Sequence, residues 1–108
     1  MTTRRAALDA GRELREALNA AADDGRFEEA DRDVFSTIHL SVTRHLANFE
    51  GRPCCGEESP RYRGFTETAA AAAEAVRTCS PTSAASVSDA QEQSRRADGM
   101  LPPITGSS

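Results

Sequence analysis

The side chains best suited to chemistry in this sequence are its two histidines and three cysteines. Imidazole nitrogens and thiolates are ligands of tetrahedral zinc sites, and pairs of thiols support redox exchange. A metal centre and a thiol switch are therefore the two kinds of site to consider. The residues concerned are His39, His45, Cys54, Cys55 and Cys79.

The spacing of these residues restricts a metal site to three of them. His39 and His45 are six residues apart, which on a helix separates them by about 9 Å along the axis and turns them to different sides. Cys79 ends a predicted helix that begins after the other two cysteines, so it lies about 25–30 Å from them. The one metal site that remains, kept as an alternative, combines His45, Cys54 and Cys55. We otherwise expect no metal and no other cofactor.

The cysteines also indicate the redox setting of the protein. A disulfide between the adjacent Cys54 and Cys55 would close a strained, readily reduced ring, so the simpler interpretation is two loop thiols that pack as small apolar groups. Cys79 falls on an apolar helical face and is predicted to be a core residue. Three cysteines are an odd number and do not form a closed disulfide framework. Free thiols are typical of the reducing cytoplasm, where we expect this protein.

Sequence motifs of the common enzyme classes are missing. The chain contains no Gly-rich phosphate loop, no Gly-x-Ser-x-Gly and no His-Glu-x-x-His. His45 lies in the middle of an apolar helical face, where a histidine is more often a hydrogen-bonded core residue than a ligand or a catalyst. The sequence therefore predicts no catalytic residue and a protein that is not an enzyme.

The longest amphipathic stretch, from Arg26 to Glu50, must position His45. At about 100° per residue, its large apolar side chains share one face with this histidine. The stretch holds three of the four phenylalanines, so we expect the other helices to bury their faces against it. The apolar residues of this face are Phe27, Val34, Phe35, Ile38, Val42, Leu46 and Phe49.

Two further amphipathic stretches accompany this helix. One runs from about Thr3 to Ala22, and a short Asp-Asp-Gly turn joins it to the central helix. Its apolar face includes Gly11, which we expect to lie against the backbone of another helix. The other stretch runs from Pro60 to about Thr78. The sequence therefore predicts an all-α fold with an antiparallel three-helix bundle over residues 1–79.

The composition changes at residue 80. Ser, Thr, Ala, Gln and Pro dominate residues 80–108, and large apolar side chains become too sparse to offset the entropy lost on ordering. We therefore expect a flexible, mostly disordered C-terminal tail that is dispensable for folding. Residues 88–97 are compatible with a short helix, because Ser88 and Gln91 are able to cap one, although this segment lacks a strong apolar face.

The charge and hydropathy of the chain restrict its partners. A net charge of −4 argues against general binding of nucleic acids or anionic membranes, and no window approaches the ~18 apolar residues of a membrane span. We therefore expect a small soluble helical accessory module of bacterial or phage type that binds another protein or a second copy of itself. The alternative is a metal- or thiol-dependent regulatory module that uses His45 and the Cys54–Cys55 loop.

Overall fold

The computed structural model describes residues 4–51 and 60–101, and these residues form four helices. The helices are α1 (Arg4–Asp23), α2 (Glu29–Gly51), α3 (Pro60–Thr78) and α4 (Ala84–Gly99). The all-α prediction is confirmed, but the predicted number of three helices is wrong, because α4 lies in the segment expected to be a tail. None of these helices is long and apolar enough to cross a membrane.

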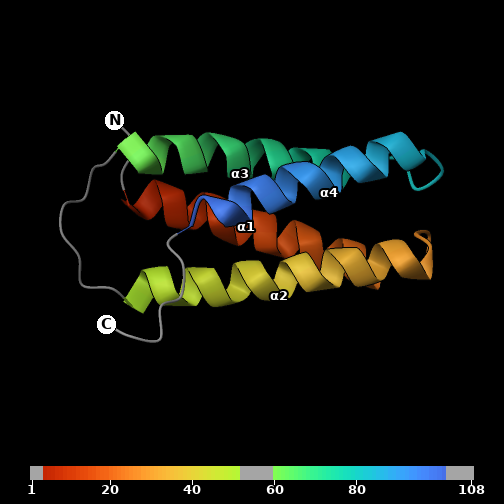
Figure 1. The fold of residues 1–108 in the computed structure, drawn as a ribbon, viewed down its shortest axis with the longest axis horizontal. Helices are drawn as coiled ribbons and strands as arrows, with labels where there is room; N and C mark the ends of the chain where they lie inside the picture. Colours follow the sequence, from red (N-terminus) through yellow and green to blue (C-terminus); the bar gives the residue numbers. More distant parts are fainter. Residues whose placement is uncertain (1–3, 52–59, 102–108) are drawn as a thin grey trace.

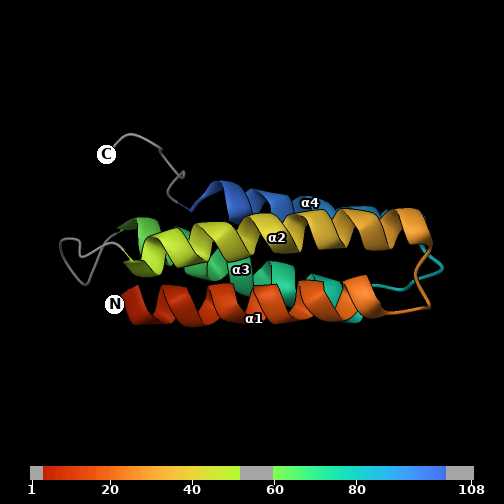
Figure 2. The ribbon, with the colours of Figure 1, turned by 90° about the horizontal axis from the view of Figure 1, so that it is seen from below.

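The helices form two antiparallel hairpins that lie against each other (Figure 1 and Figure 2). α1 and α2 make one hairpin, and α3 and α4 make the other. Between the hairpins, α1 packs on α3 and α2 packs on α4, and the helices of each of these pairs run in the same direction. This arrangement brings the middle of α2 next to α4, although the two helices are far apart in the sequence.

The turn between α1 and α2 is held by local hydrogen bonds around Asp24. Its backbone N–H donates to the carbonyl of Ala21 at 3.2 Å, and its carbonyl accepts from the N–H of Phe27 at 3.1 Å. Its carboxylate accepts from the guanidinium of Arg26 at 2.7 Å and from the N–H of that residue at 2.9 Å. These bonds, led by those from the guanidinium, hold the pKa of Asp24 below its ordinary value. The turn places Phe27 in the core, with its ring centroid 5.2 Å from that of Phe35.

The ends of α2 have complementary charges. Glu29 and Asp31 lie in the first turn, where carboxylates favour the positive end of the helix dipole. At the other end, the guanidinium of Arg4 donates to the carbonyls of Phe49 at 2.7 Å and Glu50 at 3.1 Å. The same guanidinium lies over the ring of Phe49 at 5.2 Å from its centroid. The first residue of α1 therefore satisfies two of the last carbonyls of α2.

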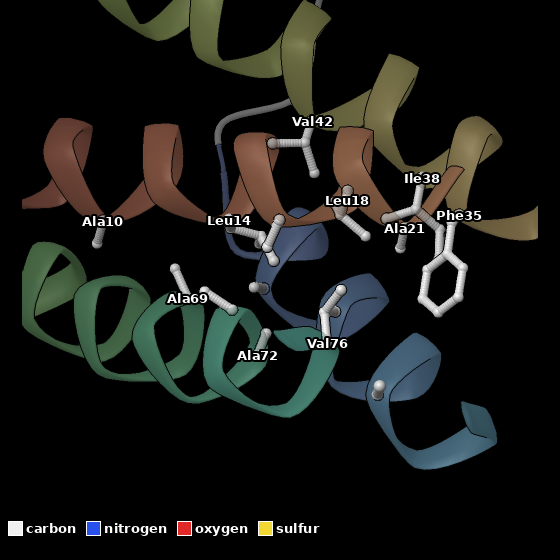
Figure 3. Packing of buried hydrophobic residues seen from close by; sticks show 14 of the residues in the cluster. Ala10, Leu14, Leu18, Ala21, Phe35, Ile38, Val42, Ala69, Ala72 and Val76 are labelled. Atoms are coloured by element: carbon white, nitrogen blue, oxygen red, sulfur yellow. The ribbon is translucent and has the colours of Figure 1, made fainter. Parts of the chain in front are cut away.

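The hydrophobic core combines large side chains of α2 with smaller ones of its neighbours. Figure 3 shows Leu14 and Leu18 of α1 packed between the apolar face of α2 and an alanine-rich face of α3. Alanine favours helix and leaves a thin side-chain layer, so α3 approaches the core closely. The buried residues of the core that Figure 3 labels are Ala10, Leu14, Leu18, Ala21, Phe35, Ile38, Val42, Ala69, Ala72 and Val76.

Gly11 is buried on α1, but the group it faces is not a helix backbone. A Cβ atom at this position would lie 2.5 Å from Cδ2 of Leu46 and 3.3 Å from Cζ of Phe65. The glycine therefore makes room for two core side chains. The predicted close approach of another backbone at Gly11 is replaced by this side-chain contact.

α4 replaces much of the predicted tail. Ser83 is its N-cap, with a hydroxyl that accepts from the N–H of Ser86 at 3.2 Å, so the helix starts before the predicted Ser88. It includes all of residues 88–97. Its buried apolar residues are small, Val87, Ala90 and Ala97. The tail prediction was wrong for residues 84–99, because it counted large apolar side chains, whereas alanine lets α4 pack closely on α3. Residues 102–108 of the predicted tail lie outside the described residues.

Candidate functional site

A polar cluster joins α2 to α4. The two carboxylate oxygens of Asp98 bind different partners: Oδ2 accepts from Oγ of Ser41 at 2.6 Å, and Oδ1 lies 2.8 Å from Nδ1 of His45. Oγ of Ser41 lies 3.4 Å from the same Nδ1. The side chains of His45 and Asp98 are 24% and 17% exposed, so this Ser41–His45–Asp98 cluster lies at the edge of the core.

The helices position the cluster in a simple way. Ser41 and His45 are one turn apart on α2, so both side chains face the neighbouring α4. Asp98 lies in the last turn of α4, on the same face as the buried Val87, Gln91 and Ser94. These four residues follow a 4-3-4 spacing, which marks one face of a helix. The sequence prediction missed this face because three of its four residues are polar. The sequence predicted a hydrogen bond for His45 but not its partner or its partial exposure.

The hydrogen bonds define which nitrogen of His45 is free. An ionised carboxylate only accepts hydrogen bonds, so Nδ1 carries the proton that bonds to Asp98. Nε2 of the neutral ring then holds the lone pair. The hydroxyl of Ser41 donates to Asp98 and not to Nε2, which is the atom that a serine nucleophile must contact in a Ser-His-Asp triad. The cluster therefore orients an imidazole but does not activate Ser41.

A hollow of about 320 Å³ opens on the outer side of α2 next to His45. Leu40, one of its lining residues, is 59% exposed. Arg44, another, forms no ion pair with any described residue. The residues around this α2 hollow are Thr37, Leu40, Ser41, Arg44 and His45.

One further polar contact joins α2 to α4. Nε2 of Gln91 on α4 lies 3.5 Å from Oδ1 of Asp31 in the first turn of α2. The fully buried Ser94 satisfies its hydroxyl within α4, where it donates to the carbonyl of Ala90 at 2.8 Å. Together, the Gln91–Asp31 contact and the Ser41–His45–Asp98 cluster fix the position of α4 along α2.

The structure places only part of the predicted metal or thiol site. His45 has Nδ1 engaged by Asp98, and His39 lies elsewhere on α2 without a hydrogen bond to any described residue. Within residues 4–51 and 60–101, no three metal-binding side chains come together. Cys54 and Cys55 lie outside the described residues, so the alternative site of His45, Cys54 and Cys55 stays a prediction.

Cys79 is a core residue, as its position in the sequence predicts. Its thiol donates to the carbonyl of Val76 at 3.2 Å. Burial raises the pKa of the Cys79 thiol, because a thiolate is poorly solvated there. This side chain is therefore kept in the protonated form, which is the less reactive one.

The described residues define a class of protein: a small bundle of two helical hairpins with an oriented histidine and an exposed leucine on one helix. Comparisons with protein-family models, curated proteins and solved structures find no match to this chain. A fold of this kind does not by itself imply a function. Function is therefore inferred from the chemistry of α2 and its neighbours.

Proposed function

We propose that this protein is a helical interaction module that self-associates through the outward face of α2. The observation that carries the proposal is the α2 hollow beside an exposed leucine. Most large apolar side chains of the described residues are withdrawn from solvent, and the exceptions are Leu40 and Met100. Leu40 stands in the middle of a helix, where its exposure has no role in the bundle itself.

The hollow has the geometry of a hole in knobs-into-holes packing. Four of its lining residues, Thr37, Leu40, Ser41 and Arg44, occupy positions i, i+3, i+4 and i+7 of one helix, which is the set that receives one side chain from a facing helix. A leucine is the usual knob for such a hole. Leu40 of a second copy therefore fits the hollow that surrounds Leu40 of the first.

The outward face of α2 continues this pattern as a stripe. Its residues are all exposed and follow a 4-3-4-3 spacing. Thr37 and Ala47 are small and permit a close approach of a second helix. We call this surface the α2 stripe; it consists of Asp33, Thr37, Leu40, Arg44 and Ala47.

The charges of the α2 stripe are self-complementary in an antiparallel pair. With two copies of Leu40 on the twofold axis, Arg44 lies about 6 Å and Asp33 about 10.5 Å along the helix from that axis, on opposite sides. Antiparallel pairing brings each Arg44 within side-chain reach of the second copy's Asp33. Neither residue forms an ion pair with any described residue, so both charges are free to pair between copies.

Sedimentation equilibrium over a range of protein concentrations tests the proposal. Two leucines, one from each copy, and two exposed ion pairs form less than a standard interface, so we expect a dimer with a dissociation constant of about 100 μM or weaker. Leu40→Ser should abolish dimerisation. Arg44→Glu should weaken it, and the double exchange Arg44→Glu with Asp33→Arg should restore it.

The matched control is Arg95→Glu, which makes the same charge change at an exposed position of α4. It should leave the dissociation constant of the wild type within about a factor of two. A wild-type protein that stays monomeric up to about 1 mM contradicts the proposal. A double exchange that fails to restore the dimer contradicts the antiparallel arrangement.

A further inference from the structure

We propose that His45 is a phosphoryl-acceptor site, in which Nε2 takes a phosphoryl group from an activated donor such as an acyl phosphate or a phosphoramidate. Three observations meet at this residue: a fixed ring orientation, a nitrogen that is open to solvent, and a neighbouring arginine that forms no ion pair with any described residue. The inference concerns the single chain and does not depend on self-association through the α2 stripe.

The orientation of the ring comes from Asp98. Its carboxylate binds Nδ1 of His45 at 2.8 Å, while Ser41 donates to the other carboxylate oxygen at 2.6 Å. Ser41 therefore prevents the carboxylate from rotating away, and the carboxylate selects the tautomer with the proton on Nδ1. This leaves Nε2 as the nucleophilic nitrogen in a fixed direction.

Nε2 of His45 is accessible. It forms no hydrogen bond with any described residue. Among the residues that the structure describes, the fully buried side-chain nitrogen and oxygen atoms without a partner are Thr43 Oγ1, Asn48 Nδ2 and Thr66 Oγ1. Nε2 of His45 also lacks a partner among the described residues, but it is not among these fully buried atoms, so it contacts solvent. The ring of His45 lines the α2 hollow. A small phosphoryl donor is therefore able to reach it from this side.

The transfer step balances with the groups present. The lone pair of Nε2 attacks phosphorus, and the bond between phosphorus and the leaving group breaks. From phosphoramidate the leaving group is ammonia, which departs with the bonding electrons and a proton taken from water. Nδ1 keeps its proton, so the phosphorylated ring is cationic and is stabilised by the carboxylate of Asp98. The guanidinium of Arg44, free of ion pairs with described residues, is available to the new phosphoryl oxygens.

His39 provides an internal reference. It lies on the same helix and is also half-buried, but it forms no hydrogen bond or ion pair with any described residue. Its ring is therefore neither oriented nor held in one tautomer. If only exposure decides reactivity, the two histidines should react alike. If Asp98 prepares the acceptor, His45 should react faster.

The test treats the full-length protein with potassium phosphoramidate and follows phosphorylation by intact mass and ³¹P NMR. In the folded wild type, His45 should react at least about tenfold faster than His39, which corresponds to about 1.4 kcal/mol in barrier. The fast phosphorylation should persist in His39→Gln and be lost in His45→Gln, which should retain only the slow reaction of His39. In concentrated urea both histidines should react at similar rates, which also shows that the reagent is active.

Variants of the two positioning residues separate this role from a purely structural one. Asp98→Asn should lower the rate at His45 to that of His39, and Ser41→Ala should give an intermediate rate, with circular dichroism confirming that each variant is folded. If Asp98 only fastens α4, its loss should expose His45 and raise the rate. The proposal is overturned if the two histidines of the folded protein react at equal rates. It is also overturned if His45 reacts as fast in Asp98→Asn as in the wild type.

Discussion

Asp98 is the residue on which the polar contact between α2 and α4 depends. Its carboxylate accepts hydrogen bonds from both Ser41 and His45. Without this carboxylate, neither of these α2 residues is bonded to α4. A charged acceptor strengthens both hydrogen bonds, although partial exposure of the cluster reduces their net contribution. At the scale of single residues, the side chain of Asp98 therefore links stability and the reactivity proposed for His45.

Replacing Asp98 by alanine should destabilise the protein. The substitution removes two hydrogen bonds and leaves two partly buried polar groups without an acceptor, so the free energy of unfolding should fall by about 1–3 kcal/mol. Asp89→Ala is the matched control, since Asp89 is an exposed residue of α4 whose one side-chain partner among the described residues is Gln93, and its effect should be about 0.5 kcal/mol or less. Urea denaturation measures both, and equal effects would contradict a special role for Asp98.

Gly11→Ala should destabilise the protein even though alanine favours helix. The new methyl group would lie 2.5 Å from Cδ2 of the fully buried Leu46, so overpacking of about 1–3 kcal/mol should exceed the propensity gain of about 1 kcal/mol. Gly64→Ala is the control. Among the described residues, its methyl group would meet only the flexible end of Met100 at 3.1 Å, so this change should stabilise. Thermal denaturation of both variants tests the contrast, and a stabilised Gly11→Ala would contradict it.

The buried thiol of Cys79 should make stability fall at alkaline pH. Because its folded pKa is raised above the unfolded value, the contribution of the neutral thiol is fully present below the unfolded pKa and is lost as pH rises through the folded one. The free energy of unfolding should therefore fall more steeply above about pH 8.5, the ordinary pKa of a thiol, than in Cys79→Ala. Both proteins should carry Cys54→Ser and Cys55→Ser, so that Cys79 is the only thiol compared. Parallel curves would show that Cys79 does not contribute.

Helices α1 to α3 were predictable because their apolar faces contain large side chains. The predicted ranges differ from the observed ones by three residues or fewer at each end. α4 was not predictable as a packed helix, because its inner face is made of small and polar residues such as Ala90, Ser94 and Asp98. The candidate site required the packing of α2 beside α4, which the periodicity of either helix alone does not specify.

α4 should contribute substantially to stability, contrary to the sequence-based expectation of a dispensable tail. Val87 is its largest fully buried side chain, and Val87→Ala should lower the free energy of unfolding by about 1–2 kcal/mol. Ser88→Ala, at the next and exposed position, should change it by about 0.5 kcal/mol or less. Urea denaturation distinguishes the two. A Val87→Ala variant as stable as the wild type would show that α4 is not packed in solution.

At the scale of the whole molecule, the contacts within and between hairpins span very different lengths of chain. The turn of the first hairpin closes over a few residues, from Ala21 to Phe27. The contacts of Asp98 with Ser41 and His45 span 57 and 53 residues. The two hairpins are therefore locally connected units, whereas the contacts between hairpins, α2–α4 and likewise α1–α3 at Gly11 and Phe65, join residues far apart in sequence.

This separation has a consequence for the order of folding. Closing a long loop costs entropy before the contact repays it, so the hairpins should form first and Asp98 should meet α2 after the rate-limiting step. Asp98→Ala should then accelerate unfolding and leave the folding rate nearly unchanged, with a φ-value near zero. Stopped-flow measurements over a range of urea concentrations give both rates. A variant that folds slowly but unfolds at the wild-type rate would mean that α2 and α4 meet early, before either hairpin is complete.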